Sequence, residues 1–301
     1  MAVRIDLHIH SDCSDGRMSL DEIFKEARRR GLSLISITDH DSIEGQERAM
    51  GLAAQQGIQY LAGLELNVSF THPDYAPDKA VSLDFLAYRY DIHDRALIRK
   101  LEELRDYRRV RAERILEKIN EELVKEHKQA FSHEDLDEIQ NSVDGTFGRP
   151  HIAEYMVRKG IVAGRQEAFD KYLVKCNVPK MPLSLQEASQ LVRGAGGKIL
   201  LAHPNHPRGT SLVTLTKTIA EQQEIIEKAM SPLIDGVECW HTAHDAVTTE
   251  TYLRFARSRG LMVSGGSDCH QSPVLMGAPP VPPEVAEQFG IHLSENSFHG
   301  E

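Results

Sequence analysis

Histidines and carboxylates gather in the first segment of the chain, where they have the spacing of metal ligands. Residues 3–10 alternate apolar and polar side chains, the period of two that indicates a strand. Alternate residues of a strand share one face, so His8 and His10 lie one pleat apart and can bind one ion together. Asp15 follows in a turn that contains Gly16 and can add a carboxylate. A half-buried strand with incidental polar residues is the weaker interpretation, because two histidines and an aspartate occur within eight residues.

Residues of the same chemical type follow other predicted strands along the chain. Apolar runs bounded by turn and helix patterns predict seven strands, over residues 3–9, 34–38, 58–64, 81–87, 198–202, 235–239 and 261–265. Their alternation with helices indicates an α/β fold, and the carboxyl ends of parallel strands in an α/β barrel converge on one mouth. We therefore predict one metal site whose candidate ligands are His8, His10, Asp15, His40, Glu65, Asp84, His203, Asp268 and His270.

The chemistry of this ligand set can be stated from its donor atoms. Imidazole and carboxylate donors without thiolate suit Mn²⁺, Zn²⁺ or Fe²⁺ and do not select among them. Nine ligands exceed the needs of one tetrahedral ion, so we expect two or three divalent ions with Glu65 as the bridging carboxylate. Two ions about 3.5–4 Å apart lower the pKa of a bridging water and clamp both oxygens of an in-line displacement. The expected nucleophile is a metal-bridging hydroxide, which is suited to phosphoester hydrolysis.

The composition of the 301-residue chain limits its class. A hydrophobic content of 41% is sufficient for a sizeable core, and a formal net charge of −10 argues against an extended nucleic-acid surface. The four cysteines form no CxxC pair, and no signal segment or membrane-spanning stretch is found. We therefore expect a cytoplasmic protein without membrane attachment, and the sequence indicates no obligate protein partner.

Strand–helix alternation is interrupted between about residues 92 and 182, where helical patterns predominate. A long charged run over residues 95–127 carries apolar side chains at helical spacing. Shorter helices are predicted over residues 132–139, 150–159 and 165–173. We interpret this part as a helical insertion within a single domain that spans residues 1–301.

Several short segments together resemble the motifs of the PHP (polymerase and histidinol phosphatase) superfamily: Asp6–Ser11, Thr38–Asp41, Gly63–Glu65, Ala202–Pro204 and Gly266–His270. Gly148–His151 and Asp235–Glu238 are similar to its TrpH-like phosphoesterase branch, which includes nucleoside 3′,5′-bisphosphate phosphatases and a 5′-to-3′ exoribonuclease. The resemblance covers roughly residues 1–280 in order. It implies a distorted, TIM-like (β/α)₇ barrel with a di- or trinuclear metal site at its mouth and a helical insertion over it.

The resemblance also implies how the ligands divide among the ions. The first ion takes His8, His10, Glu65 and Asp268, the second takes Asp15, His40 and His270, and the third takes His203 and Asp84 and shares Glu65. The family generally has histidine where this chain has Asp84, so the third site is either altered in affinity or absent. His72 is a possible substitute ligand, although an ordinary loop histidine is the preferred interpretation.

Residues near the predicted mouth are candidates for substrate binding. Arg149 and His151 lie at a turn before a helix, and arginine suits bidentate phosphate binding. With the family resemblance we favour substrate contact there over simple helix-start polarity, and Arg149 is also a catalytic candidate that would neutralise the phosphoryl oxygens. His206 and Arg208 lie on a loop with proline and glycine, and substrate binding and solvent exposure are equally compatible with their positions.

Two histidines after the sixth predicted strand are further catalytic candidates. His241 and His244 could contact phosphate or protonate the leaving oxygen, and a supporting role beside the ligands fits them equally. Cys13 and Cys269 lie inside the motifs, and we interpret both as packing residues rather than nucleophiles. Trp240 is interpreted as a packing residue at the barrel end rather than a base-stacking platform.

The sequence thus predicts a metal-dependent phosphoesterase that hydrolyses a small phosphorylated substrate. The branch resemblance suggests a nucleotide substrate, either a 3′,5′-bisphosphate that loses its 3′-phosphate or the 5′ end of a short oligoribonucleotide. A histidinol-phosphate or cyclic-phosphate hydrolase would use the same site. An amidohydrolase-type C–N hydrolase also opens on an HxH strand, but it would normally need a bridging lysine where this chain has Glu65. A non-catalytic metal-binding module would be signalled by the loss of several ligands.

Overall fold

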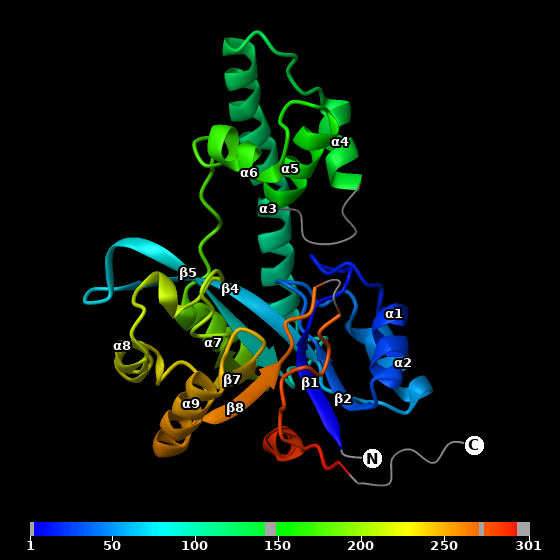
Figure 1. Ribbon diagram of the computed structural model, residues 1–301, viewed down its shortest axis with the longest axis vertical. Coiled ribbons are helices and arrows are strands. Elements are labelled where there is room, and N and C mark those ends of the chain that lie inside the picture. Colours follow the sequence, from blue (N-terminus) through cyan, green and yellow to red (C-terminus); the bar gives the residue numbers. More distant parts are fainter. Residues whose placement is uncertain (1–2, 142–148, 271–273, 294–301) are drawn as a thin grey trace. The chain divides into compact units, whose positions relative to one another are not determined.

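The computed structural model describes residues 3–141, 149–270 and 274–293 (Figure 1). The chain divides into two compact units, one made of Met1–Ile98 and Pro182–Glu301 and the other of Arg99–Met181. The second unit lies within the helical segment expected over residues 92–182. That the whole chain forms one domain stays a prediction.

The first unit begins with a three-stranded parallel sheet in which β1 (Arg4–Ile9) pairs with β2 (Leu32–Ile37) and β2 with β3 (Gln59–Tyr60). All six residues of β2 are buried, as expected of a strand covered on both faces. The connecting helices α1 (Leu20–Arg29) and α2 (Gln46–Gln56) contact each other, and α1 also contacts β2. This β–α–β–α–β arrangement brings the carboxyl ends of β1 and β2 side by side.

The other strands of this unit form a five-stranded sheet, in the order β4 (Gly63–His72), β5 (Ala76–Tyr88), β6 (Lys198–Leu201), β7 (Gly236–His241) and β8 (Met262–Gly266). β5 runs antiparallel to both β4 and β6, whereas β6, β7 and β8 are parallel. The expectation that Glu65 follows the end of a parallel strand was therefore wrong. Glu65 and Asp84 both lie inside the antiparallel ribbon, in which Leu64, Leu66, Val68 and Phe70 alternate toward the core.

The two sheets meet at their edges without merging into one. Isolated parallel bridges join Ile9 to Cys269 and His40 to Glu65, and β1 also contacts β8. A side chain at Gly266 would collide with the backbone and Cβ of His8, so this contact requires glycine. The mixed α/β class is confirmed. However, the described strands number eight rather than seven, and they form two sheets with no closed sheet among them.

The remaining helices of the first unit follow their strands. α7 (Leu185–Gly194) and α9 (Ala246–Arg259) agree with the helices that sequence periodicity predicts over residues 184–195 and about 247–259. The single helix expected near residues 213–230 is instead divided into three pieces: η2 (Leu212–Thr214), α8 (Ile219–Ile225) and the π-helical turn η3 (Ile226–Met230). Threonines at the junction favour caps and turns over a continuous helix, which accounts for the break. A last 3₁₀ segment, η4 (Pro283–Phe289), contacts β8.

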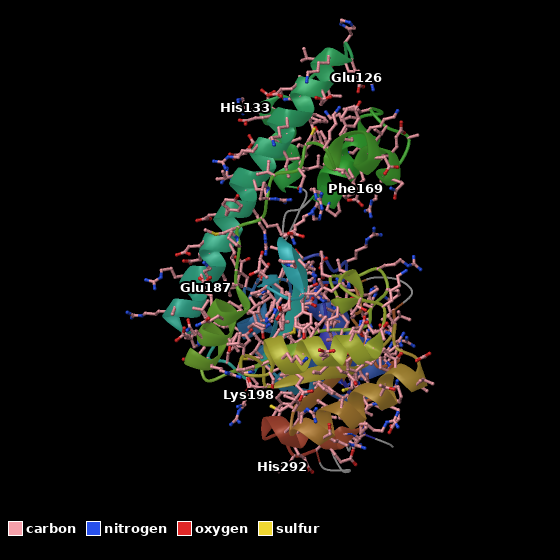
Figure 2. All side chains as sticks on the ribbon, turned by 90° about the vertical axis from the view of Figure 1, so that its left-hand side faces the viewer. Glu126, His133, Phe169, Glu187, Lys198 and His292 are labelled. Atoms are coloured by element: carbon pink, nitrogen blue, oxygen red, sulfur yellow. The ribbon has the colours of Figure 1, made fainter. Side chains whose placement is uncertain are left out.

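The second unit is helical and has its own core. Most of α3 (Arg95–Lys125) belongs to it, with α4 (His133–Asn141), α5 (Arg149–Arg158), α6 (Arg165–Ala168) and the π-helical turn η1 (Phe169–Leu173). Figure 2 shows charged side chains projecting along α3, as expected of a charged run of this kind, which is usually a solvated helix face. Apolar residues from α3 to η1 pack into one cluster within this unit. Of the helices that the structure describes, none has the length and hydropathy needed to cross a bilayer.

Candidate metal centre

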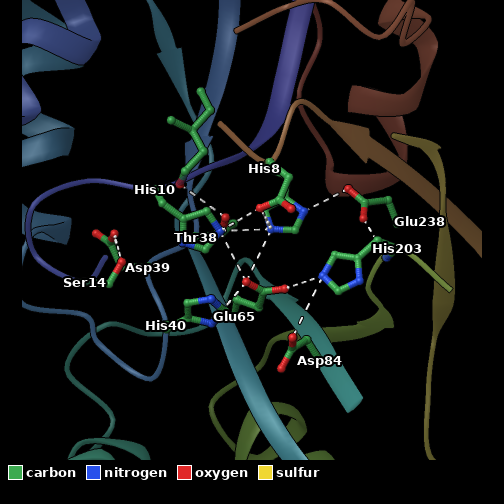
Figure 3. Close-up of polar contacts among 12 residues, drawn as sticks. His8, His10, Ser14, Thr38, Asp39, His40, Glu65, Asp84, His203 and Glu238 are labelled. Carbon is green, nitrogen blue, oxygen red and sulfur yellow. Dashed lines mark hydrogen bonds and ion pairs between the residues drawn. The ribbon is translucent and has the colours of Figure 1, made fainter. Parts of the chain in front are cut away.

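The two histidines of the first strand are the start of the site. His8 lies in β1 and His10 directly follows it, and both side chains are fully buried. Their Nε2 atoms are 3.1 Å apart, so the predicted placement of the two rings on one face is confirmed (Figure 3). Gly16 allows the turn after β1 to pack against the backbone of His10, because a side chain at this position would overlap the carbonyl of His10.

Glu65 lies at the centre of the site, as Figure 3 shows. Its Oε2 atom is 3.4 Å from His8 Nε2, 3.2 Å from His10 Nε2 and 3.2 Å from His40 Nδ1. The other oxygen, Oε1, is 3.0 Å from His203 Nε2. One buried carboxylate thus faces four imidazoles that come from three different segments of the chain.

Asp268 closes the site from the last strand. Its Oδ1 is 3.4 Å from His8 Nε2 and 3.2 Å from His10 Nε2. His270 Nε2 lies 3.2 Å from Asp15 Oδ1, which returns the contact to the turn after β1. The beginning and the end of the first unit therefore supply adjoining walls of one site.

Three groups of side chains have donor atoms close enough to hold an ion, within 4.8 Å of one another in each group. They are His10, Asp15, His40 and His270; His8, His10, Glu65 and Asp268; and Glu65, Asp84 and His203. The structure therefore brings together all nine of the residues predicted as ligands. His72 lies at the end of β4, beside Asp74, and belongs to none of the groups.

Asp84 is held in place by its neighbour across the ribbon. Asn67 stands directly opposite it in the β4–β5 register, and Asn67 Nδ2 donates a hydrogen bond to Asp84 Oδ1 (2.6 Å). The second oxygen, Oδ2, lies 4.0 Å from His203 Nε2. The amide thereby orients the carboxylate so that Oδ2 is directed to the third group.

Two buried carboxylates that the sequence analysis did not assign support the ligands. Asp39 accepts hydrogen bonds from Ser11 N (2.7 Å), Ser11 Oγ (2.6 Å) and Ser14 Oγ (2.6 Å), which fixes the turn that carries Asp15. Glu238, in β7, accepts from His8 Nδ1 (3.0 Å) and from the backbone N–H of His203 (2.8 Å). The role of Glu238 could have been suspected from a carboxylate inside an apolar strand, because a buried carboxylate is stable only when it has partners.

The histidines and carboxylates shift one another's pKa values strongly. Burial alone lowers the pKa of His10, but the nearby carboxylates of Asp268 and Glu65 raise it to about 10. Burial likewise opposes protonation of His203, whereas its bond to Glu65 raises its pKa to about 9. The pKa of His8 is also raised, against burial, by the charges of Glu238 and Glu65. The pKa of Glu65 is lowered despite burial, chiefly by His40 and His8, so the carboxylate is ionised.

The donor set fits divalent cations. In the described part of the chain, the buried atoms His10 Nδ1, Glu65 Oε2 and His203 Nδ1 form no hydrogen bond. Several carboxylates and imidazoles converge at the site. Nitrogen and carboxylate oxygen are donors that suit Mn²⁺, Zn²⁺ and Fe²⁺. Two of the candidate ligands, His203 (φ 24°) and Asp268 (φ 53°), also have left-handed backbone conformations, a form of strain that concentrates at functional sites.

The predicted catalytic histidines differ in their surroundings. His241 Nδ1 accepts from the backbone N–H of Ala243 (3.0 Å), so its proton is on Nε2, which is 3.3 Å from Asp268 Oδ2. His244 Nδ1 donates to the carbonyl of Cys239 (2.9 Å), and burial lowers the pKa of His244 to about 4. A neutral His244 with its proton committed to the backbone is poorly prepared to protonate a leaving group.

The predicted substrate-binding residues belong to both units. His206 packs its ring edge-on against His203 and His241, with centroids 5.7 Å and 5.5 Å away, while Arg208 is exposed on the same loop. Arg149 and His151 lie in α5 of the second unit, where the Arg149 guanidinium stands 5.6 Å from the Phe169 ring centroid. Gly148, which precedes them, is outside the described residues. Substrate contact by these four residues stays a prediction.

Comparison with known proteins places the chain in a family. Residues 6–175, more than half of the chain, match the PHP domain family. The chain therefore belongs to the PHP domain family, as the sequence motifs predicted. Together with the relatives and structures that follow, this membership identifies it as a hydrolase.

Two relatives cover nearly the whole chain. A 3′,5′-nucleoside bisphosphate phosphatase of Chromobacterium violaceum is 27% identical over 278 residues, which are 88% of this chain and 87% of that protein. A 5′-3′ exoribonuclease of Haemophilus influenzae is 26% identical over 280 residues, 90% of this chain and 91% of that protein.

Solved structures show the same likeness over both chains. A candidate metal-dependent phosphoesterase of Bifidobacterium adolescentis has a TM-score of 0.74 and 27% identity, with 96% of each chain covered. A Chromobacterium violaceum protein described as an amidohydrolase, with bound sulfate and no metal, has a TM-score of 0.73 and 26% identity over 94% of this chain and 93% of that chain.

Proposed function

We propose that this protein is a metal-dependent phosphoesterase that hydrolyses a nucleotide phosphoester. The candidate reactions are removal of the 3′-phosphate from a nucleoside 3′,5′-bisphosphate and 5′-to-3′ removal of nucleotides from short oligoribonucleotides. The observation that carries the proposal is the convergence of three ligand groups on the shared carboxylate Glu65 in a member of the PHP family. The relatives that act on bisphosphonucleotides and RNA support the nucleotide part.

The ligand groups define which residues would hold two or three ions. His8, His10 and Asp268 would hold one with Glu65, and Asp15, His40 and His270 a second with His10. His203 and Asp84 would hold a third, again with Glu65. The metal would be Mn²⁺, Zn²⁺ or Fe²⁺, because the donors are nitrogen and carboxylate oxygen.

The chemistry divides between ions and protein. Bound divalent ions would supply an activated water and neutralise charge on the phosphoryl group. The protein's part is to hold the donors in position: Asp39 fixes the turn of Asp15, and Glu65 lies almost fully buried among its histidines. His241 holds a proton on Nε2 beside Asp268 and is the better placed of the two histidines to act near a leaving oxygen. Arg149, His151, His206 and Arg208 are the proposed contacts for substrate phosphates.

A C–N hydrolase is the second candidate, since one similar structure is described as an amidohydrolase. The central ligand of this site is the carboxylate of Glu65, at the position where a C–N hydrolase of this type would normally need a bridging lysine. This donor set favours phosphoester chemistry. The proposed location is the cytoplasm, which agrees with four free cysteines.

The test is a phosphate-release screen of the Mn²⁺-loaded protein against 3′,5′-bisphosphonucleotides, 5′-mononucleotides, histidinol phosphate, cyclic phosphates and short RNAs. We expect release from a 3′,5′-bisphosphate or stepwise shortening of RNA, abolished by a chelator and by His10→Ala. Inactivity on every phosphoester, with ions bound, would favour the C–N hydrolase. Preference for histidinol phosphate or a cyclic phosphate would overturn the nucleotide assignment alone.

A further inference from the structure

Glu238 is a fully buried carboxylate beside the metal centre, and it belongs to none of the three ligand groups. It lies in the middle of β7, where all six residues are buried, and its own side chain has no exposed surface. Each of its two oxygens accepts one hydrogen bond, and the two donors are ligand candidates of different groups. Glu238 therefore links two residues that belong to different ligand groups.

The first bond determines which nitrogen of His8 is available. An ionised carboxylate only accepts hydrogen bonds, so the bond of 3.0 Å to Glu238 Oε1 requires a proton on His8 Nδ1. His8 Nε2 is then the atom directed at Glu65 and Asp268, at 3.4 Å from each.

The second bond holds the backbone of a residue in another group. Glu238 Oε2 accepts from the N–H of His203 (2.8 Å), and His203 has a φ of 24°, which a residue with a side chain rarely adopts. The ring of His203 lies stacked at 5.8 Å from that of His8. The Glu238 carboxylate thus fixes the ring of His8 in one ligand group and the strained backbone of His203 in another.

We propose that Glu238 is a positioning residue that directs His8 Nε2 into the centre and holds His203 in its strained conformation, so that two ion positions depend on it. The inference rests on the proposed metal centre. The ion held by Asp15, His40 and His270 depends on Glu238 least, because neither His8 nor His203 belongs to that group. Of the three ion positions, the two that use His8 or His203 should therefore depend on Glu238, and the position formed by His10, Asp15, His40 and His270 should not.

Glu238→Gln is the informative variant, because it keeps the shape of the side chain. An amide offers one acceptor oxygen and one NH₂ group, so it cannot accept from both His8 and His203. Asp6→Asn is the matched control. Asp6 is also fully buried and accepts backbone N–H bonds from His8 (3.3 Å), Ser267 (2.8 Å) and Gly277 (2.7 Å), so Asp6→Asn perturbs buried backbone bonds beside the centre while the bond from His8 Nδ1 to Glu238 stays in place.

The measurement is the number of Zn²⁺ ions per chain and their affinities, by chelator competition on the full chain. For Glu238→Gln we expect about a 10- to 100-fold loss of affinity at two positions, with the third filled as in the wild type. Adding His40→Ala to Glu238→Gln should remove that remaining ion as well. The increase in Tm on adding Zn²⁺ should shrink for Glu238→Gln and persist for Asp6→Asn, whatever each does to the metal-free Tm.

The outcomes are distinct. A wild type that binds no ion refutes the proposed function itself. Wild-type ion binding with unchanged affinities in Glu238→Gln overturns only the role of Glu238. An equal loss at all three positions, or an equal loss in Asp6→Asn, also overturns it, because the effect would then be general destabilisation. An NMR signal from the His8 Nδ1–H of the Zn²⁺-loaded protein that moves in Glu238→Gln, but not in Asp6→Asn, supports it.

Discussion

Metal binding should displace protons from this site, and the number displaced is the sharpest quantitative consequence of its structure. The pKa of His8 is raised well above its usual value, that of His10 to about 10 and that of His203 to about 9. His10 and His203 are therefore protonated at pH 8 in the metal-free protein. An ion needs their lone pairs, so each must lose its proton when the centre fills.

The magnitude follows from these values. With a pKa of about 10, deprotonating His10 at pH 7 costs about 4 kcal/mol, and His203, at about 9, costs about 2.7 kcal/mol. Filling the centre at pH 8 should release about two protons from His10 and His203, and His8, whose pKa is also raised, adds to this release. Three ordinary histidines with pKa values near 6.5 would release only about 0.1 proton in total.

Isothermal titration calorimetry with Zn²⁺ in buffers of different ionisation enthalpy measures this number. His203→Gln should reduce the release by about one proton. His40→Gln should leave it nearly unchanged, since burial lowers the pKa of His40 and the ring is already neutral. Release should also decline as the pH passes 9 and then 10. A release of about 0.1 proton at pH 8, or equal effects of the two variants, would refute the electrostatic reasoning.

Three further expectations concern stability and the individual positions. Metal-free protein should lose stability between pH 6.5 and 10. The protonated forms of His10 and His203, whose pKa values are raised, stabilise the fold fully below pH 6.5, and this effect is lost as the pH rises through about 9 to 10. A Tm of the chelator-treated protein that does not change over this pH range would contradict the prediction. Asn67→Leu should weaken the ion held by Asp84 without changing the fold, as judged by ion counting and circular dichroism, and equal occupancy would show that the amide is dispensable. Gly266→Ala should destabilise by about 1–3 kcal/mol in chemical denaturation because its methyl group would overlap His8, whereas Gly51→Ala, in open space on α2, should not destabilise.

The histidine strand was predictable because its information is local. Alternation over residues 3–10 determines both the strand and the shared face of His8 and His10, and the structure confirms both. The limits of α7 and α9 also follow from local apolar periodicity and from caps such as Ser184. Such features need no knowledge of distant partners.

The antiparallel ribbon was missed because strand direction depends on the partner. The alternation of Leu64, Leu66, Val68 and Phe70 was a visible sign of a longer strand with two unlike faces. Asp84 was a candidate because of the order of the motifs along the chain. Its partners, Asn67 and His203, depend on the register of β4 and β5, which the sequence does not specify locally.

The supporting carboxylates were beyond local reasoning for a similar reason. Glu238 contacts His8 across 230 positions and His203 across 35, so nothing near Glu238 in the sequence specifies its role. Asp39 lies beside the predicted ligand His40, but its hydrogen bonds go to a turn formed more than twenty residues earlier.

The central claim is that a cluster of at least two ions carries phosphoester hydrolysis, and one titration tests it directly. Metal-free protein is loaded stepwise with Mn²⁺, and bound ions per chain and phosphate release from a nucleoside 3′,5′-bisphosphate are measured in the same samples. We expect activity to rise as the second ion binds and to be lost in His10→Ala, whose side chain belongs to two ligand groups. Binding of one ion or none at saturation, or activity that persists after chelation, would contradict the account.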